Sequence, residues 1–199
     1  RSKGIPAMGS GNVYPIPLEE ILVDPFNIPP EWKRMYALDV GWNRTAVLWA
    51  AVDPNSDTIY IYDEHYQGEA LPSVHAAAIR ARGPNLWGVI DPASRGRSQI
   101  DGVSLMQSYK NLGLNIFPAK NEVEGGISNT TQRLSTGKIK VFRHLMNFQK
   151  EYMIYRRDEK GRIIKESDHL MDCLRYIVNN LNRARSTVSS TTGVYNGTK

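Results

Sequence analysis

Cysteine is the residue that this sequence has least of, since Cys173 is the only one among 199 residues. A single cysteine excludes an internal disulfide framework and a cysteine-rich zinc site, and it fits an intracellular compartment. No apolar run approaches the roughly 18 residues that a membrane span requires. The chain opens with Arg1-Ser2-Lys3-Gly4, without an initiator Met or the apolar region of a signal peptide. We therefore expect a piece excised from a longer protein.

A nucleotide-binding phosphate loop is missing as well. The pattern G-x-x-x-x-G-K-[ST] occurs nowhere, and Gly137-Lys138 fails because Ile139 follows it. The composition that remains is ordinary for a globular domain, with 41% hydrophobic and 23% charged residues. The formal charge of +5 and the isoelectric point of about 9.3 permit attraction to a polyanion without identifying one.

The distribution of glycine and proline predicts the organisation of the chain. Both concentrate at the start, so residues 1–32 are predicted to be an extended connector. Residues 33–185 carry the apolar periodicities of one domain. Residues 186–199 are rich in Ser, Thr and Gly with almost no apolar content, which predicts a disordered tail.

Apolar periodicity predicts a mixed sheet. Short runs joined by tight turns indicate an antiparallel meander at residues 35–40, 46–52 and 58–63. Two further strands, 86–90 and 114–117, alternate with helices at 73–82 and 100–112, which implies parallel crossovers. Other helices are expected at 122–135, 143–151 and 168–185, and a basic β-hairpin at 153–165. The expected fold class is α/β, a mixed five-stranded sheet flanked by helices with a β-hairpin insertion.

Three aspartates occupy positions where an acid is unfavourable. Asp39 interrupts an apolar strand, Asp91 ends another, and Asp172 lies on the last helix opposite its apolar stripe. Burying a carboxylate costs free energy unless it is paired, hydrogen-bonded or bound to a metal. Mg²⁺ and Mn²⁺ prefer such oxygen ligands. Two alternatives to a metal site remain open, because Asp91 before Pro92 could cap a turn and Asp172 could be solvated helix surface.

The order of these acids resembles a known family. The run 36–41, Tyr-Ala-Leu-Asp-Val-Gly, looks like the first strand of ribonuclease-H-like nucleases, and 88–91, Gly-Val-Ile-Asp, looks like their fourth. The run 168–176, Asp-His-Leu-Met-Asp-Cys-Leu-Arg-Tyr, is similar to the D-H-x-x-D-x-L-R-Y signature that closes the nuclease domain of tailed-phage large terminase subunits. Residues 4–16 resemble the segment that joins their ATPase to their nuclease. Short-tailed, headful-packaging phages are the most similar group.

The resemblance implies a metal-dependent endonuclease that cuts concatemeric double-stranded viral DNA during packaging into procapsids, with little sequence specificity. Asp39, Asp91 and Asp172 would be the ligands of two Mg²⁺ or Mn²⁺ ions, with Asp39 bridging both, and the ions would clamp the phosphodiester. His169 would be an auxiliary group near the metal or phosphate. A helix histidine bonded to a carbonyl is the alternative.

The same resemblance implies partners and a location. The partners would be DNA, the portal protein, the small terminase subunit and an N-terminal ATPase domain that this sequence does not include. The location would be the host cell cytoplasm, with no membrane association. Without the ATPase domain, the piece would not translocate DNA by itself.

Basic residues offer candidate DNA contacts. Six are singled out because they follow Asp91 or lie in the expected hairpin: Arg95, Arg97, Arg156, Arg157, Lys160 and Arg162. Such side chains would neutralise phosphates without reading sequence. For the hairpin, a solvated turn balanced by Asp158 and Glu159 is the alternative. Trp42 and Tyr176 are interpreted as packing residues.

Two choices stay open at this level. Asp168 is a second candidate ligand one helical turn before Asp172, but its position at a helix start is explained by capping. As for function, the same acids would serve a junction resolvase or transposase-like nuclease, and a docking module that holds DNA or the portal without cutting it would not need them for chemistry.

Overall fold

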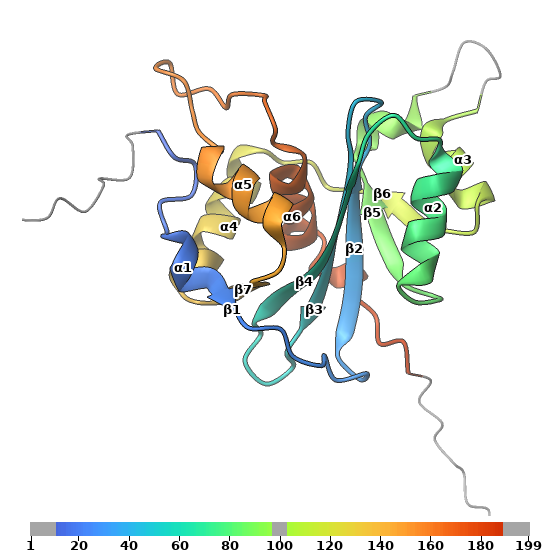
Figure 1. Cartoon of the computed structure of the whole chain (residues 1–199), viewed down its shortest axis with the longest axis horizontal. Helices are drawn as coiled ribbons and strands as arrows, with labels where there is room; N and C mark the ends of the chain where they lie inside the picture. Colours follow the sequence, from blue (N-terminus) through green and yellow to red (C-terminus); the bar gives the residue numbers. More distant parts are fainter. Residues whose placement is uncertain (1–10, 97–102, 189–199) are drawn as a thin grey trace, which may run out of the picture.

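The computed structural model describes residues 11–96 and 103–188, which form a seven-stranded mixed sheet (Figure 1). The strands lie in the order β1-β7-β4-β3-β2-β5-β6. Their bounds are Leu22–Val23 (β1), Lys33–Asp39 (β2), Thr45–Val52 (β3), Ile59–Gln67 (β4), Trp87–Ile90 (β5), Asn115–Pro118 (β6) and Ile139–Phe142 (β7). Of these, β3 alone runs antiparallel to its neighbours. The carboxyl ends of the other strands therefore share one edge of the sheet.

The predicted fold class is confirmed, but the predicted count of five strands is wrong. The five expected strands form β2 to β6, and two short strands, β7 and β1, extend the sheet beside β4. The sequence pattern that could predict β7 is only four residues long, and β1 consists of two residues in a proline-rich segment. Both exist because they pair with a neighbouring strand, and tertiary pairing of this kind leaves little local pattern.

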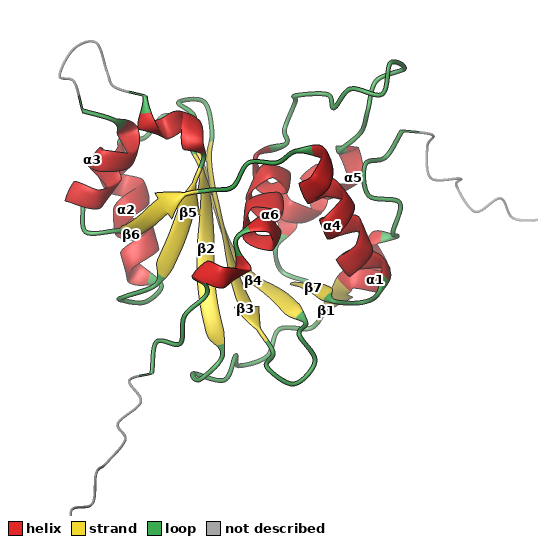
Figure 2. Ribbon diagram, turned by 180° about the vertical axis from the view of Figure 1, so that it is seen from behind, coloured by secondary structure: helices red, strands yellow, loops and turns green. Residues whose placement is uncertain are grey.

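Helices cover both faces of the sheet, as the views from opposite sides show (Figures 1 and 2). One face carries α1 (Leu18–Ile21), α4 (Glu124–Ser135), α5 (Met146–Ile154) and α6 (His169–Asn179). The other face carries α2 (Pro72–Ala81) and α3 (Leu105–Asn111). Two short 3₁₀ helices, η1 (Pro92–Arg95) and η2 (Leu181–Arg183), follow β5 and α6. No helix in the described part of the chain is long and apolar enough to cross a membrane.

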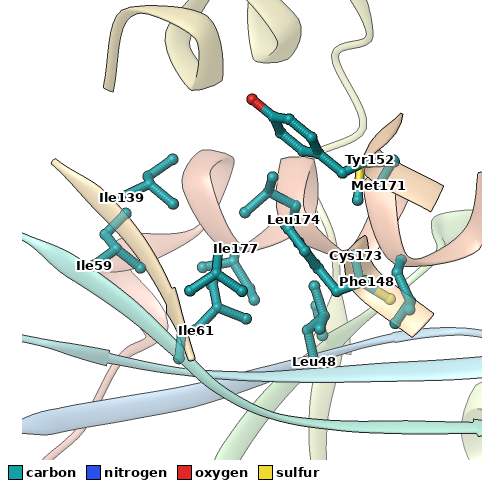
Figure 3. Close-up of a cluster of buried hydrophobic side chains, with 14 of the residues drawn as sticks. Leu48, Ile59, Ile61, Ile139, Phe148, Tyr152, Met171, Cys173, Leu174 and Ile177 are labelled. Atoms are coloured by element: carbon teal, nitrogen blue, oxygen red, sulfur yellow. The ribbon is translucent and has the colours of Figure 1, made fainter. Parts of the chain in front are cut away.

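Each face buries its own hydrophobic cluster because side chains alternate along a strand. On β2, Met35 and Ala37 belong to the cluster under α6, while Tyr36 and Leu38 belong to the cluster under α2. Figure 3 shows the first cluster, in which Leu174 and Ile177 of α6 lie over strand residues such as Ile61. Asp39 has the same parity as Ala37, so it faces α6.

The amino-terminal segment differs from the expected extended connector. Within its described part, Tyr14, Ile21 and Leu22 are buried in the cluster under α6. The Val13 N–H donates to the Tyr155 carbonyl at 3.0 Å, and β1 pairs with β7. This segment is therefore packed from Val13 onward. Whether residues 1–32 link the domain to an ATPase stays a prediction.

Two element bounds also differ from expectation. The last helix ends at Asn179 and not near Arg185, because the Asn180 side chain donates to the Tyr176 carbonyl and accepts from the Lys120 N–H. The expected hairpin at 153–165 loses its first arm, since Met153 and Ile154 belong to α5. A single bridge, Arg157↔Ile163, closes the turn that remains. The start of the expected helix 100–112 lies outside the described residues.

Candidate active site

Two of the predicted acids meet at the carboxyl edge of the sheet. Asp39 is the last residue of β2, and Asp91 directly follows β5. These strands are parallel neighbours in which Leu38 pairs with Ile90, and the Asp91 N–H donates to the Leu38 carbonyl at 3.4 Å. The strand register therefore brings the two carboxylates together, although 52 positions separate them in the sequence.

The first turns of α6 bring the remaining candidates to the same place. His169 Nδ1 lies 2.9 Å from Asp39 Oδ2, and this contact joins residues 130 apart in the sequence. Asp172 lies one turn further along the same face of the helix, as its spacing predicts. The negative charges of Asp172 and Asp91 both lie close enough to Asp39 to raise the pKa of its carboxyl. The His169 ring therefore contacts a carboxylate; it does not make the bond to a carbonyl that the alternative required.

Burial dominates the electrostatics of Asp39. It raises the pKa of the Asp39 carboxyl, and the charges of Asp172 and Asp91 act in the same direction, while the bond to His169 opposes them. The Asp39 hydrogen bond raises the pKa of His169 in turn. The side chain of Asp39 is only 13% exposed, so its negative charge needs a compensating group in place.

Asp172 is held by two cations. Arg175 Nη2 donates to Asp172 Oδ1 at 2.7 Å, and Lys165 Nζ lies 3.3 Å from Oδ2. Arg175 is buried, and its Nη1 also donates to Asn121 Oδ1 in the loop after β6. Asp172 is therefore not solvated helix surface, which was the alternative for this residue.

Asp91 combines the two roles considered for it. Its Oδ1 accepts the Ala93 N–H at 3.0 Å and so caps η1, as expected of an aspartate before proline. The cap occupies one oxygen of a carboxylate that stands beside Asp39. Turn capping and a ligand role do not exclude each other here.

Asp168 does not act as the predicted cap. It precedes α6, but its side chain accepts no hydrogen bond from the first turn. Instead its Oδ2 lies 3.0 Å from Lys165 Nζ, so the same lysine contacts both Asp168 and Asp172. The first free N–H groups of α6 donate to Glu151, which lies on α5.

The carboxylates of the site are suitable ligands for a hard divalent cation, although their oxygens are not arranged around a single point. Among the described residues, no three His, Cys, Asp or Glu side chains are arranged to hold a metal ion as they stand. Asp39, Asp91 and Asp172 supply the carboxylate oxygens that Mg²⁺ and Mn²⁺ prefer. At Asp39 only Oδ2 faces His169, so Oδ1 would serve the metal. At Asp172, whose Oδ1 binds Arg175, the metal would take Oδ2 in place of Lys165.

The predicted DNA-binding residues divide into free and engaged cations. Arg162 pairs with Asp158 at 2.9 Å within the turn, as the balanced-turn alternative requires, whereas Arg157 pairs with Glu124 of α4 at 2.7 Å and so ties the turn to that helix. Arg95, Arg156 and Lys160 are exposed, and none forms an ion pair within the described residues. Arg97 lies outside the described residues.

One aromatic interpretation is confirmed and one is wrong. Tyr176 is 2% exposed and packs in the core. Trp42 is 66% exposed in the turn that follows β2, three residues after Asp39. The turn is fixed, because the Thr45 hydroxyl donates to the Gly41 carbonyl and the Glu69 N–H donates to that of Trp42. Trp42 is thus an exposed apolar side chain in the turn at the carboxyl end of β2.

Sequence reasoning missed Glu151, the role of Arg175 and that of Lys165, which was grouped with the basic residues of the hairpin as a candidate DNA contact. Arg175 belongs to the recognised signature, so its spacing of three residues from Asp172 was an available signal. Glu151 lies among apolar residues of an expected helix, and this position was a weaker signal. Lys165 gave no signal that separates it from its basic neighbours.

Comparison with known proteins agrees with this geometry. A family model described as the terminase RNaseH-like domain matches residues 37–181. The large terminase subunits of Enterobacteria phage LP7 and Salmonella phage P22 are 30% identical over 186 residues, which cover 88% of this chain. The match covers 39% and 37% of those proteins, so the chain spans less than two fifths of the length of these relatives.

Solved structures give the same result. The P22 large terminase nuclease domain has a TM-score of 0.82 at 28% identity, covering 90% of this chain and 96% of that one. The large terminase nuclease of thermophilic phage G20c, solved with bound magnesium, has a TM-score of 0.64 and covers 86% and 98% of the two chains. At 15% identity the latter shows the fold alone.

Proposed function

Because this chain belongs to the terminase RNaseH-like domain family, we propose that it is a divalent-metal-dependent endonuclease that cuts double-stranded viral DNA during genome packaging. The observation that carries the proposal is the meeting of Asp39, Asp91 and Asp172, from β2, the end of β5 and α6, at the carboxyl edge of the sheet. Ligand sites in open α/β sheets lie at this edge. The bound magnesium of the G20c nuclease supports the choice of metal.

We assign Asp39, Asp91 and Asp172 as the ligands of two Mg²⁺ or Mn²⁺ ions. When bound, such ions activate water and stabilise the charge that develops on a phosphodiester. Asp39, the last residue of β2, experiences the charges of both Asp91 and Asp172, so its carboxylate would be the central ligand of the site. Arg175 holds Asp172 in place from the protein interior, because its other guanidinium nitrogen is fixed to Asn121.

The remaining residues have roles that follow from their surroundings. His169 holds Asp39 by one ring nitrogen, which leaves Nε2 free to donate to a phosphate oxygen or to hold a proton. Arg95, Arg156 and Lys160 carry exposed positive charge for the DNA backbone. These contacts position a duplex without reading its sequence, which agrees with cutting at little sequence specificity.

Supercoiled plasmid tests this function directly. The wild-type chain, incubated with Mn²⁺ or Mg²⁺, should release nicked and linear products, and a chelator should stop the reaction. No product with either metal would leave the non-catalytic docking module as the function. Preference for a branched substrate over linear duplex would favour the junction-resolvase alternative.

The contacts with packaging proteins are also proposals. By family, the portal protein, the small terminase subunit and an ATPase domain would be partners. The large terminase of another thermophilic bacteriophage, solved in complex with ADP, is a relative that binds a nucleotide in a longer chain. Pull-down of portal protein by this chain, with the P22 nuclease domain as the reference, would test the portal contact.

A further inference from the structure

A β-bulge in β4 directs two polar side chains toward the helices that carry the site. Trp49 of β3 pairs with Asp63 and Ala50 pairs with Ile61, so Tyr62 is an extra residue in β4. An extra residue reverses the alternation of the side chains that follow it. Glu64 and Tyr66 consequently face α5, on the same side of the sheet as Ile61.

Glu64 fixes the start of α5 to the sheet. Its Oε1 accepts the Asn147 N–H at 2.9 Å, and its Oε2 accepts the Phe148 N–H at 2.8 Å. These N–H groups belong to the first turn of α5 and have no partner within the helix. The carboxylate therefore takes the place of an amino-terminal cap supplied from another element.

Glu151 repeats this arrangement between α5 and α6. Its carboxylate is 2% exposed and lies in the space between β4, α5 and α6. Oε1 accepts the Tyr66 hydroxyl at 2.6 Å, and Oε2 accepts the Leu170 N–H at 2.6 Å and the Met171 N–H at 3.4 Å. Burial raises the pKa of the Glu151 carboxyl to about 7.

The two N–H groups that Glu151 binds lie between His169 and Asp172 in the sequence. We propose that Glu151, held by Tyr66, is a positioning residue for the candidate active site, which fixes the first turn of α6 and so places His169 and Asp172 against Asp39. The inference rests on the proposed nuclease function for its effect on cleavage. Glu151 contacts the backbone of α6 and is not itself assigned a contact with DNA or metal.

Loss of Glu151 should affect the reaction rate because an active site tolerates only small displacements of its side chains. Without the carboxylate, the buried Leu170 and Met171 N–H groups and the partly buried Tyr66 hydroxyl would lose their partner, and the turn would loosen to reach water. Displacement of a reacting constellation by about 1 Å can lower a rate by about two orders of magnitude. Loss of Glu151 should thus lower kcat more than its effect on stability explains.

Four variants of this chain test the proposal: Glu151→Ala, Glu151→Gln, Tyr66→Phe and, as matched control, Glu64→Ala. Glu64 also binds two helix N–H groups, but at α5, which carries none of the site aspartates. We measure kcat and KM on plasmid with Mn²⁺, the melting temperature, and amide hydrogen exchange at Leu170 and Met171.

Glu151→Ala should lower kcat on the order of tenfold or more with KM nearly unchanged, and it should speed exchange at both amides. Glu151→Gln, which keeps an acceptor for Leu170 and a donor for the Tyr66 oxygen, should retain kcat within about threefold. Glu64→Ala should lose comparable stability and keep kcat within the same limit.

Normal kcat in Glu151→Ala, or kcat losses that simply follow the melting temperature across the set, would overturn the proposal. If Glu151→Ala does not fold, Tyr66→Phe decides, because it removes the hydroxyl that orients the carboxylate: unchanged kcat and unchanged exchange would then overturn it. A wild-type chain that cuts no DNA defeats the proposed function, whereas the exchange rates still test the cap.

Discussion

Asp168 and Asp172 contact the same lysine, yet their surroundings predict different consequences of substitution. Asp172 is the counter-charge of the buried Arg175, and the charge of Asp172 acts on Asp39. Asp168 is buried as well, but its ion pair among the described residues is with Lys165, whose side chain is 61% exposed, and not with Arg175. The ligand role proposed for Asp172 therefore has no equivalent at Asp168.

Asp172→Asn should abolish plasmid cleavage and also lower the free energy of unfolding, on the order of 2 kcal/mol, because Arg175 loses its buried partner charge. Asp168→Asn should keep most cleavage and lose on the order of 1 to 2 kcal/mol, because a buried carboxylate loses its charged contact with Lys165. Cleavage assays paired with urea unfolding measure both quantities. An active Asp172→Asn beside an inactive Asp168→Asn would move the third ligand one turn back along α6.

Trp42 is the residue whose environment the sequence predicted least well. An aromatic side chain after an apolar strand is typical of packing, and only the turn geometry shows it to be 66% exposed near Asp39. Periodicity reports which residues alternate; it does not report where a turn directs its side chains. The same limit applies to Lys165, which became recognisable only through its contacts.

We expect Trp42→Ala to weaken binding to duplex DNA by on the order of 1 kcal/mol, because an exposed indole that contacts the duplex buries apolar surface there. Leu71→Ala is the matched control, since Leu71 is 64% exposed at the start of α2. Fluorescence anisotropy of labelled duplex measures both affinities. Equal affinities for Trp42→Ala and Leu71→Ala would show that the indole does not contact DNA.

At the scale of elements, a histidine pair joins β4 to α2. His65 Nε2 lies 2.9 Å from His75 Nδ1, so one ring nitrogen donates to the other, which requires at least one neutral ring. Burial, the His75 charge and Arg82 lower the pKa of His65 to about 4, with Asp63 acting in the opposite direction. Burial also lowers the pKa of His75, against a hydrogen bond to the Ala70 backbone.

These shifts predict acid sensitivity. A histidine whose folded pKa lies below its unfolded value of about 6.5 stabilises the fold above that pH. The stabilisation is lost as the pH falls from about 6.5 toward 4. Urea unfolding at pH 7.5 and pH 5 should show a drop for the wild type, and His65→Gln should reduce that drop by on the order of 1 kcal/mol, since solvent screens a partly buried ring. The same pH dependence in both proteins would assign it to other groups.

Elements with long alternating or apolar patterns could be predicted from the sequence, and elements that depend on a partner could not. β2, β3 and β4 follow their patterns, whereas β1 and β7 form through pairing with each other and with β4. The bulge at Tyr62 is invisible to periodicity because the run 58–63 alternates without interruption. The bulge nevertheless determines that Glu64 and Tyr66 face the helices of the site.

At the scale of the whole molecule, the site depends on contacts between distant segments. The resemblance to ribonuclease-H-like strands and to the terminase signature made Asp39, Asp91 and Asp172 the candidates, and the mixed sheet explains why the first two meet. No local pattern predicted that Asp39 would bond to His169 across 130 positions, or that Glu151 would replace Asp168 as the cap of α6. These contacts arise from the packing of α5 and α6 on the sheet, which only the folded chain contains.

We propose above all that the aspartates at the carboxyl edge of the sheet hold the metal ions needed for DNA cleavage. Asp39→Asn tests this most directly, because Asp39 stands between the β2 and α6 sides of the site and Asn preserves its shape and its bond to His169. In plasmid cleavage with Mn²⁺, the account predicts loss of nicked and linear products by at least about two orders of magnitude, with a far-UV spectrum and a cooperative melting transition like those of the wild type. Cleavage by Asp39→Asn at the wild-type rate would contradict it.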